Sequence, residues 1–75
     1  MAIVRNLKFQ PLEGESRHSE TECTYTIVNA AGGPYLQIDT YGSRQRRIPG
    51  KKSQSIRFAP EAVEQLKTIL TRRFV

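Results

Sequence analysis

Residues 22–41, ECTYTIVNAAGGPYLQIDTY, contain two runs of alternating side chains on either side of a turn sequence. Residues 22–28 are rich in β-branched and aromatic side chains, and residues 35–41 alternate in the same way, a pattern typical of β-strands. Between them, the segment from Asn29 to Pro34 contains two adjacent glycines beside a proline, which favour a turn. The stretch therefore predicts an antiparallel β-hairpin.

Alternation assigns the side chains of this hairpin to two faces. Cys23, Tyr25 and Ile27 share one face of the first strand, and Leu36 and Ile38 share one face of the second. We expect Cys23 to be buried there as an inert small hydrophobic residue. The opposite face of the second strand carries Tyr35, Gln37, Asp39 and Tyr41.

A further strand is predicted over residues 54–58, QSIRF, where polar and apolar residues alternate again. This pattern places Ile56 and Phe58 inward, and Ser55 and Arg57 outward. Ser55 and Arg57 would then lie on the sheet face that carries the polar residues of the preceding strand.

A helix is predicted from Pro60 toward the C-terminal end. Proline is tolerated at the first helical position, Glu61 is favourable in the first turn, and Arg72 and Arg73 are favourable in the last. The apolar residues recur at spacings of three and four and form one broad stripe. A 75-residue chain buries a smaller fraction of its surface than a larger domain does, about 60%, so we expect this stripe to pair two copies of the chain. The predicted dimer interface consists of Val63, Leu66, Leu70 and Phe74.

The N-terminal residues complete the predicted domain. Residues 1–10 contain a weaker strand pattern, through Ile3 and Val4 and then from Leu7 to Phe9, and residues 11–21 have the composition of a mobile loop. We therefore predict one α+β domain over residues 1–75. Its order is β-β-β-β-α, with a curved four-stranded antiparallel sheet followed by one C-terminal helix.

Positive charge is concentrated in the segment 42–58, GSRQRRIPGKKSQSIRF, which holds six Arg or Lys residues and no Asp or Glu. Removing these six charges from the net +5 leaves −1 for the rest of the chain, so the positive charge is local. A localised cluster indicates a surface for a polyanion, although a solvated basic loop over residues 42–53 would show the same composition. Tyrosines on the neighbouring face could stack on unpaired bases or pack across strands. The candidate nucleic-acid-binding residues are Tyr35, Tyr41, Arg44, Arg46, Arg47, Lys51, Lys52 and Arg57.

The sequence offers little for catalysis. His18 lies in a polar segment, Cys23 is the only cysteine, and Asp39 is the only aspartate, so neither a nucleophile with its base nor a carboxylate cluster is evident. Metal-ligand spacing and phosphate-binding glycine loops are also missing from the sequence. We therefore expect a binding protein and not an enzyme, with no metal, cofactor or small-molecule substrate.

The second half of the chain resembles a known family over roughly residues 35–70. Leu36-x-Ile38-x-x-Tyr41, the basic Pro49-Gly50-Lys51-Lys52 connection and the segment from Ser55 to Glu61 are similar to the C-terminal domain of the transcriptional coactivator PC4 and to whirly-type proteins. The resemblance implies a curved antiparallel sheet followed by a helix, a homodimer, and binding of single-stranded DNA in transcription or related transactions. The chain departs from the family at Gly42, where the coactivator has a tryptophan, which removes a stacking platform.

These observations predict a homodimeric, largely sequence-independent single-stranded DNA-binding protein, with RNA as a further ligand. The absence of a signal-peptide pattern or apolar span, together with the single cysteine, predicts a cytoplasmic protein without membrane contact. A small protein-interaction module without nucleic-acid binding is the alternative. A ribbon-helix-helix repressor would require a second helix, for which no residues follow Val75.

Overall fold

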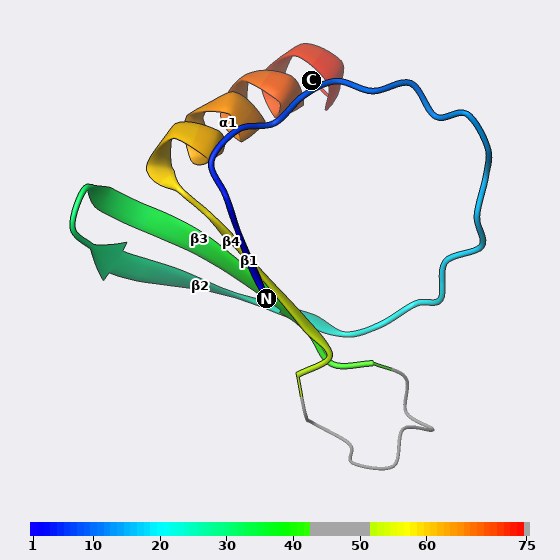
Figure 1. Cartoon of the computed structure of the whole chain (residues 1–75), viewed down its shortest axis with the longest axis horizontal. Helices are drawn as coiled ribbons and strands as arrows, with labels where there is room; N and C mark the ends of the chain where they lie inside the picture. The colour runs from blue at the N-terminus through cyan, green and yellow to red at the C-terminus, as the bar shows by residue number, and fades with distance from the viewer. Residues whose placement is uncertain (43–51, 75) are drawn as a thin grey trace.

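The structure, a computed structural model, describes residues 1–42 and 52–74 and combines one four-stranded sheet with one helix (Figure 1). This arrangement confirms the predicted α+β layout and the order β-β-β-β-α. The elements are β1 (Ala2–Val4), β2 (Cys23–Ala30), β3 (Gly33–Thr40), β4 (Gln54–Phe58) and α1 (Pro60–Phe74).

Strands β2 and β3 form the predicted hairpin, with a register that runs from Cys23 opposite Thr40 to Ala30 opposite Gly33. The connection is tighter than the sequence predicts, because pairing continues to Ala30 and leaves a two-residue turn. Gly32 and Gly33 adopt φ values of +94° and +123°, a region that side chains with a Cβ rarely enter. The adjacent glycines are therefore what allows the hairpin to close so tightly.

The sheet has the order β1-β4-β3-β2 and is mixed. Strand β4 pairs antiparallel with β3, as predicted, and the register places Arg57 opposite Gln37 and Ser55 opposite Asp39. Strand β1 pairs with β4 in parallel, from Ala2 opposite Ile56 to Val4 opposite Phe58, so the prediction of a wholly antiparallel sheet is wrong at this edge.

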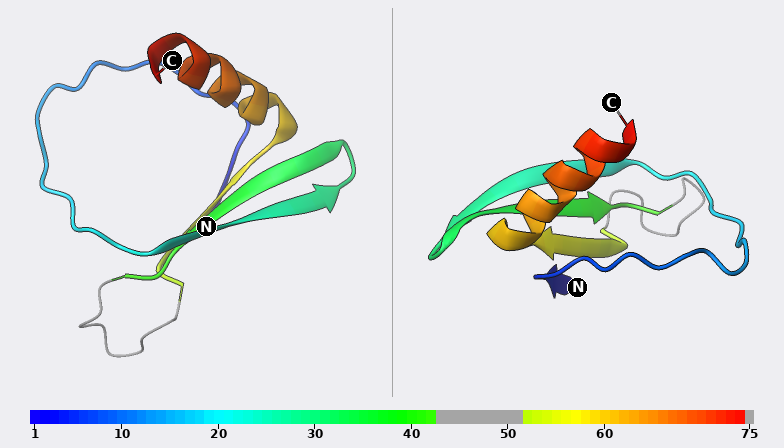
Figure 2. Two further views of the ribbon diagram at one scale, coloured as in Figure 1. Left: turned by 180° about the vertical axis from the view of Figure 1, so that it is seen from behind. Right: turned by 90° about the horizontal axis from the view of Figure 1, so that it is seen from above.

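The first strand is also shorter than the predicted segment through Phe9. It ends at Val4, after which the chain leaves the sheet and runs beside α1 (Figure 2). The backbone N–H of Leu7 donates to Oε1 of Gln65 at 2.7 Å, and Nε2 of Gln65 donates to Oδ1 of Asn6 at 2.8 Å. Bonds to the helix thus replace bonds to the sheet. Residues 11–21 are exposed and lie outside helices and strands.

The junction between β4 and α1 is the most buried part of the described chain. Ala59 and Ala62 are fully buried, and the N–H of Ala59 donates to the carbonyl of Val4 at 2.9 Å. The carbonyl of Ala59 in turn accepts from the N–H of Val63 at 2.9 Å in the first helical turn. Two small residues therefore let β1, β4 and the helix meet closely.

Helix α1 packs against β3 and β4, and its C-terminal end diverges from the strands (Figures 1 and 2). The apolar residues farther along the sheet remain accessible: Tyr25 is 75% exposed, Ile27 54% and Ile56 38%. The predicted burial of Cys23 is wrong, because it lies on this uncovered part of β2 and is exposed. Two predictions in β4 are also wrong: Ser55, predicted to face outward, is buried, and Ile56, predicted to face inward, is exposed.

Within the described residues, α1 is too short and too polar to cross a membrane.

Candidate functional site

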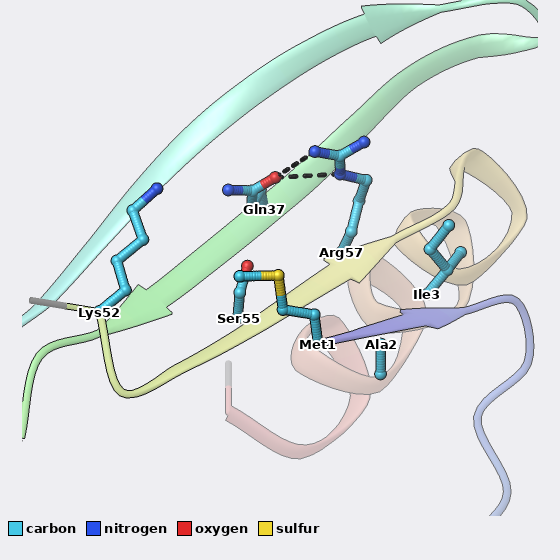
Figure 3. Close-up of a pocket in the computed structure, with 7 residues that line it drawn as sticks. All are labelled: Met1, Ala2, Ile3, Gln37, Lys52, Ser55 and Arg57. Atoms are coloured by element: carbon cyan, nitrogen blue, oxygen red, sulfur yellow. Dashed lines mark hydrogen bonds between the residues drawn. The ribbon is translucent and has the colours of Figure 1, made fainter.

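One face of the sheet collects polar side chains from three neighbouring strands. Residues paired across strands lie on the same side of a sheet, and successive residues alternate between sides. The observed register therefore unites seven residues, which we call the polar face: Thr24, Thr26, Tyr35, Gln37, Asp39, Ser55 and Arg57. In Figure 3, α1 lies behind the sheet, on the side away from Gln37 and Arg57. The predicted sharing of one face by Tyr35, Gln37, Asp39, Ser55 and Arg57 is confirmed.

A continuous chain of polar contacts crosses this face. Nζ of Lys52 lies 3.3 Å from Oδ2 of Asp39, and Nε2 of Gln37 donates to both carboxylate oxygens of Asp39, at 3.2 and 3.1 Å. Oε1 of Gln37 accepts from Nε of Arg57 at 3.0 Å and also from Nη2. The neutral amide of Gln37 thus joins an ion pair on one side to a guanidinium on the other, and Figure 3 shows its two bonds to Arg57.

Asp39 is the most buried residue in this series of polar contacts, with 2% of its surface exposed. Hydrogen bonds from Ser55 and Gln37, aided by Lys52, hold the pKa of Asp39 below its ordinary value of 3.8, although burial acts in the opposite direction. Asp39 is therefore ionised at neutral pH. Its negative charge is offset by Lys52 and by hydrogen bonds from Gln37 and Ser55, and its burial reduces its repulsion of an approaching anion.

The two positive charges in this series of polar contacts differ in how far a negative charge offsets them. The charge of Lys52 is offset by Asp39, whereas the polar contacts of Arg57 with the described residues are with the neutral oxygen of Gln37. Among residues 1–42 and 52–74, the observed salt bridges join Arg5 to Glu61, Lys52 to Asp39, and Lys67 to Glu64. None of them includes Arg57, so no carboxylate among the described residues neutralises this guanidinium.

A depression of about 350 Å³ lies beside Arg57, between β1 and β3 (Figure 3). Its wall on β1 is apolar, and Ile3 of that strand pairs with Arg57 in the parallel register. The opposite wall is polar and cationic. The lining residues are Met1, Ala2, Ile3, Gln37, Lys52, Ser55 and Arg57.

The two candidate tyrosines differ in their environment. Tyr35 lies within β3, opposite Val28, and is partly exposed on the polar face. Tyr41 follows the end of β3, and its hydroxyl shares a 2.8 Å hydrogen bond with Oγ1 of Thr24. The Tyr41 ring is therefore tethered to β2, which restricts the positions it could offer to a base.

The structure brings together only part of the predicted basic site. Lys52 and Arg57 both line the depression, whereas Arg44, Arg46, Arg47 and Lys51 lie outside the described residues. The linking role of Gln37 and Asp39 and the wall formed by β1 were not predicted from the sequence. The sequence did contain a signal for the first of these, because QID in β3 and SIR in β4 both place polar residues on either side of an isoleucine, which puts those polar residues on one face.

The predicted dimer residues follow the length of α1. Val63 and Leu66, in the first half, are partly buried, whereas Leu70 is 47% and Phe74 77% exposed. The exposed end of the stripe lies on the part of the helix that diverges from the sheet (Figure 1). We call Tyr25, Ile27, Ile69, Leu70 and Phe74 the open apolar surface.

Other candidate groups lie apart from the polar face. His18 is exposed, and its Nδ1 lies 2.9 Å from the backbone oxygen of Ser16 in the same segment. No group of three His, Cys, Asp or Glu side chains in residues 1–42 and 52–74 is arranged to hold a metal ion.

Comparisons of the chain with protein-family models, curated proteins and solved structures gave no match.

Proposed function

We propose that the protein binds single-stranded DNA, or RNA, through the polar face and the basic segment 42–58, largely without regard to base sequence. The observation that carries the proposal is the position of Arg57 on the polar face without a carboxylate partner among the described residues. Cations beside partly exposed aromatic rings are the groups that single-stranded nucleic acids require, for phosphates and bases respectively.

The charge distribution favours phosphate as the principal ligand group. Asp39 is the only carboxylate among the residues of the polar face, and it is enclosed by Lys52, Gln37 and Ser55. An approaching polyanion therefore meets the Arg57 guanidinium and the Lys52 ammonium before the carboxylate. Binding of this kind releases counterions and depends steeply on salt.

The parallel edge strand limits what the resemblance to PC4-like proteins implies. Strand β1 is added parallel to β4, whereas that family has an antiparallel sheet. The proposed activity is therefore argued from the side chains of the polar face. The shared features that remain are β3, β4 and a helix that begins with Pro60 and Glu61.

We include a homodimer in the proposal, formed through the predicted residues Val63, Leu66, Leu70 and Phe74. The open apolar surface supports it, because Ala59 and Ala62 are the only fully buried hydrophobic residues among those described. A single chain thus leaves large side chains in water that a second copy would cover. We place this dimer in the cytoplasm, where Cys23 would remain a thiol.

The first test is fluorescence anisotropy of a labelled mixed-sequence 20-nucleotide single strand, titrated with the protein at several salt concentrations. The same titration with the duplex serves as the comparison. Tighter binding of the single strand with a steep salt dependence is the expected result. Equal affinity for both forms, or no binding at low salt, would contradict the proposal.

The open apolar surface also favours a second candidate, a protein-interaction module without nucleic-acid binding. In that case α1 and β2 would dock on another protein, and the basic segment would serve solubility. The anisotropy titration separates the two candidates, because the second predicts indifference to oligonucleotides at low salt.

A further inference from the structure

The amide of Gln37 is fixed in one orientation by the chemistry of its two neighbours. The ionised Asp39 carboxylate can only accept hydrogen bonds, and the Arg57 guanidinium can only donate them. The amide nitrogen must therefore face Asp39 and the amide oxygen must face Arg57, which is the observed arrangement. A flipped amide would place donors against donors and acceptor against acceptor.

This orientation determines which edge of Arg57 remains free. Gln37 occupies Nε and one N–H of Nη2, the two groups along one side of the guanidinium. The second N–H of Nη2 and both of Nη1 are left for a ligand within the described part of the chain. The second N–H of Nη2 and the adjacent N–H of Nη1 form the end-on edge of the guanidinium, which binds two oxygens of one phosphate in parallel.

The depression beside Arg57 limits what can accompany that phosphate. A volume of about 350 Å³ is near the lower end of the roughly 300–1,000 Å³ typical of small-ligand sites, so it suits one nucleotide unit. Its β1 wall presents Ile3, which is largely exposed and pairs with Arg57 in the register. An apolar wall next to a cation matches a base or sugar joined to a phosphate.

We infer that the depression is a binding site for a single nucleotide unit, whose phosphate is held end-on by Arg57 and whose base or sugar lies against Ile3. Gln37 is a positioning residue, because its amide oxygen holds the Arg57 guanidinium, and Asp39 acts one step further away by orienting the amide of Gln37. This inference rests on the proposed function, since it identifies where one nucleotide of the bound strand is seated. It also assigns a role to β1, which carried no candidate residue in the sequence.

The first experiment observes Arg57 directly by NMR of the arginine Nε–Hε signals in the ¹⁵N-labelled protein. The signal that disappears in Arg57→Lys identifies the residue. Thymidine 5′-monophosphate is expected to shift this signal, and thymidine, which lacks the phosphate, is expected to leave it in place. A monophosphate that shifts other arginine signals but not that of Arg57 would overturn the inference.

The second experiment measures the affinity for the 20-nucleotide strand. Arg57→Lys retains the charge but loses the planar edge, and we expect roughly tenfold weaker binding. Gln37→Met should weaken binding through Arg57, so combining the two substitutions should add little. The matched control is Gln10→Met, since Gln10 is exposed and lies outside both the polar face and the basic segment 42–58.

The outcomes separate the inference from the function on which it rests. If Arg57→Lys binds the strand as tightly as the wild type, the inference fails and the proposed function stands. If additive losses from Gln37→Met and Arg57→Lys are found, the positioning role fails. If the wild-type protein binds no oligonucleotide, both the proposed function and the inference fail. Circular dichroism of each variant establishes that it is folded.

Discussion

Gly33 lies directly against Pro60, so that a Cβ on Gly33 would come within 3.2 Å of Cγ of the proline ring. The end of the hairpin turn thus contacts the first residue of the helix. Gly33 also has a φ of +123°, so it is constrained both by its own backbone and by the helix. This contact fixes where α1 begins relative to β3.

Alanine substitutions at three glycines should therefore destabilise the protein in a graded order. Gly14 has open space around it and no positive φ, Gly32 has open space but a φ of +94°, and Gly33 has both constraints. We expect Gly14→Ala to be nearly neutral, Gly32→Ala to cost on the order of 1–3 kcal/mol, and Gly33→Ala to cost more. Urea unfolding measures the series. Equal losses at Gly32 and Gly33 would show that the contact with Pro60 is unimportant.

Acid should destabilise the protein through Asp39. A pKa that is lower in the folded chain than in the unfolded chain contributes stability above the ordinary value of 3.8, and this stability is lost as the pH falls below it. We expect the free energy of unfolding to drop between pH 5 and pH 2, and Asp39→Asn to reduce that drop. Glu15→Gln, in the exposed segment 11–21, retains Asp39 and should retain the wild-type profile. Identical profiles for Asp39→Asn and the wild type would contradict this assignment.

The salt dependence of nucleic-acid binding should depend more on where the positive charges lie than on the net charge. Replacing Arg46, Arg47 and Lys51 together by glutamine is expected to reduce the slope of log affinity against log salt by up to about 2, since each contact with a single strand contributes about 0.7. Lys52 is kept because it pairs with Asp39. The control, Lys67, Arg72 and Arg73 replaced together by glutamine, removes the same charge from α1 and should leave the slope unchanged. Equal slopes for the two triple variants would count against a localised binding surface.

The proposed dimer should depend on the exposed end of the helix. Replacing both Leu70 and Phe74 with serine is expected to yield a monomer by light scattering coupled to size-exclusion chromatography, because these side chains lose their apolar contacts. Thr68→Ser, on the same helix, should leave the mass unchanged. A wild-type protein that is monomeric at micromolar concentration would contradict the dimer.

The elements with strong local signals were predictable from the sequence. The hairpin has alternation and a glycine pair, β4 has alternation, and α1 has proline, acidic and basic residues in their favourable positions. The pairing of β1 was not predictable, because three residues carry little pattern and their partner strand is distant in the chain. The place and direction of so short a strand in the sheet can be assigned only when its neighbour is known.

The polar face was predictable in its membership but not in its contacts. Alternation placed Gln37, Asp39 and Arg57 together, whereas the burial of Asp39 depends on the surrounding side chains. The error at Cys23 has a related cause. Alternation separates two faces, but it does not tell how far a 15-residue helix extends over one of them.

The parallel pairing of residue 2 with residue 56 closes a loop that includes most of the chain. Closing so large a loop costs more conformational entropy than closing the hairpin does. We therefore expect β1 to join the sheet after β2, β3 and β4 have assembled, and to detach from it first. Backbone amides of Ile3 and Val4 should then exchange with deuterium faster than those of Leu36 and Ile38. Since Met1 and Ile3 line the depression, its apolar wall would be the last part of the molecule to form.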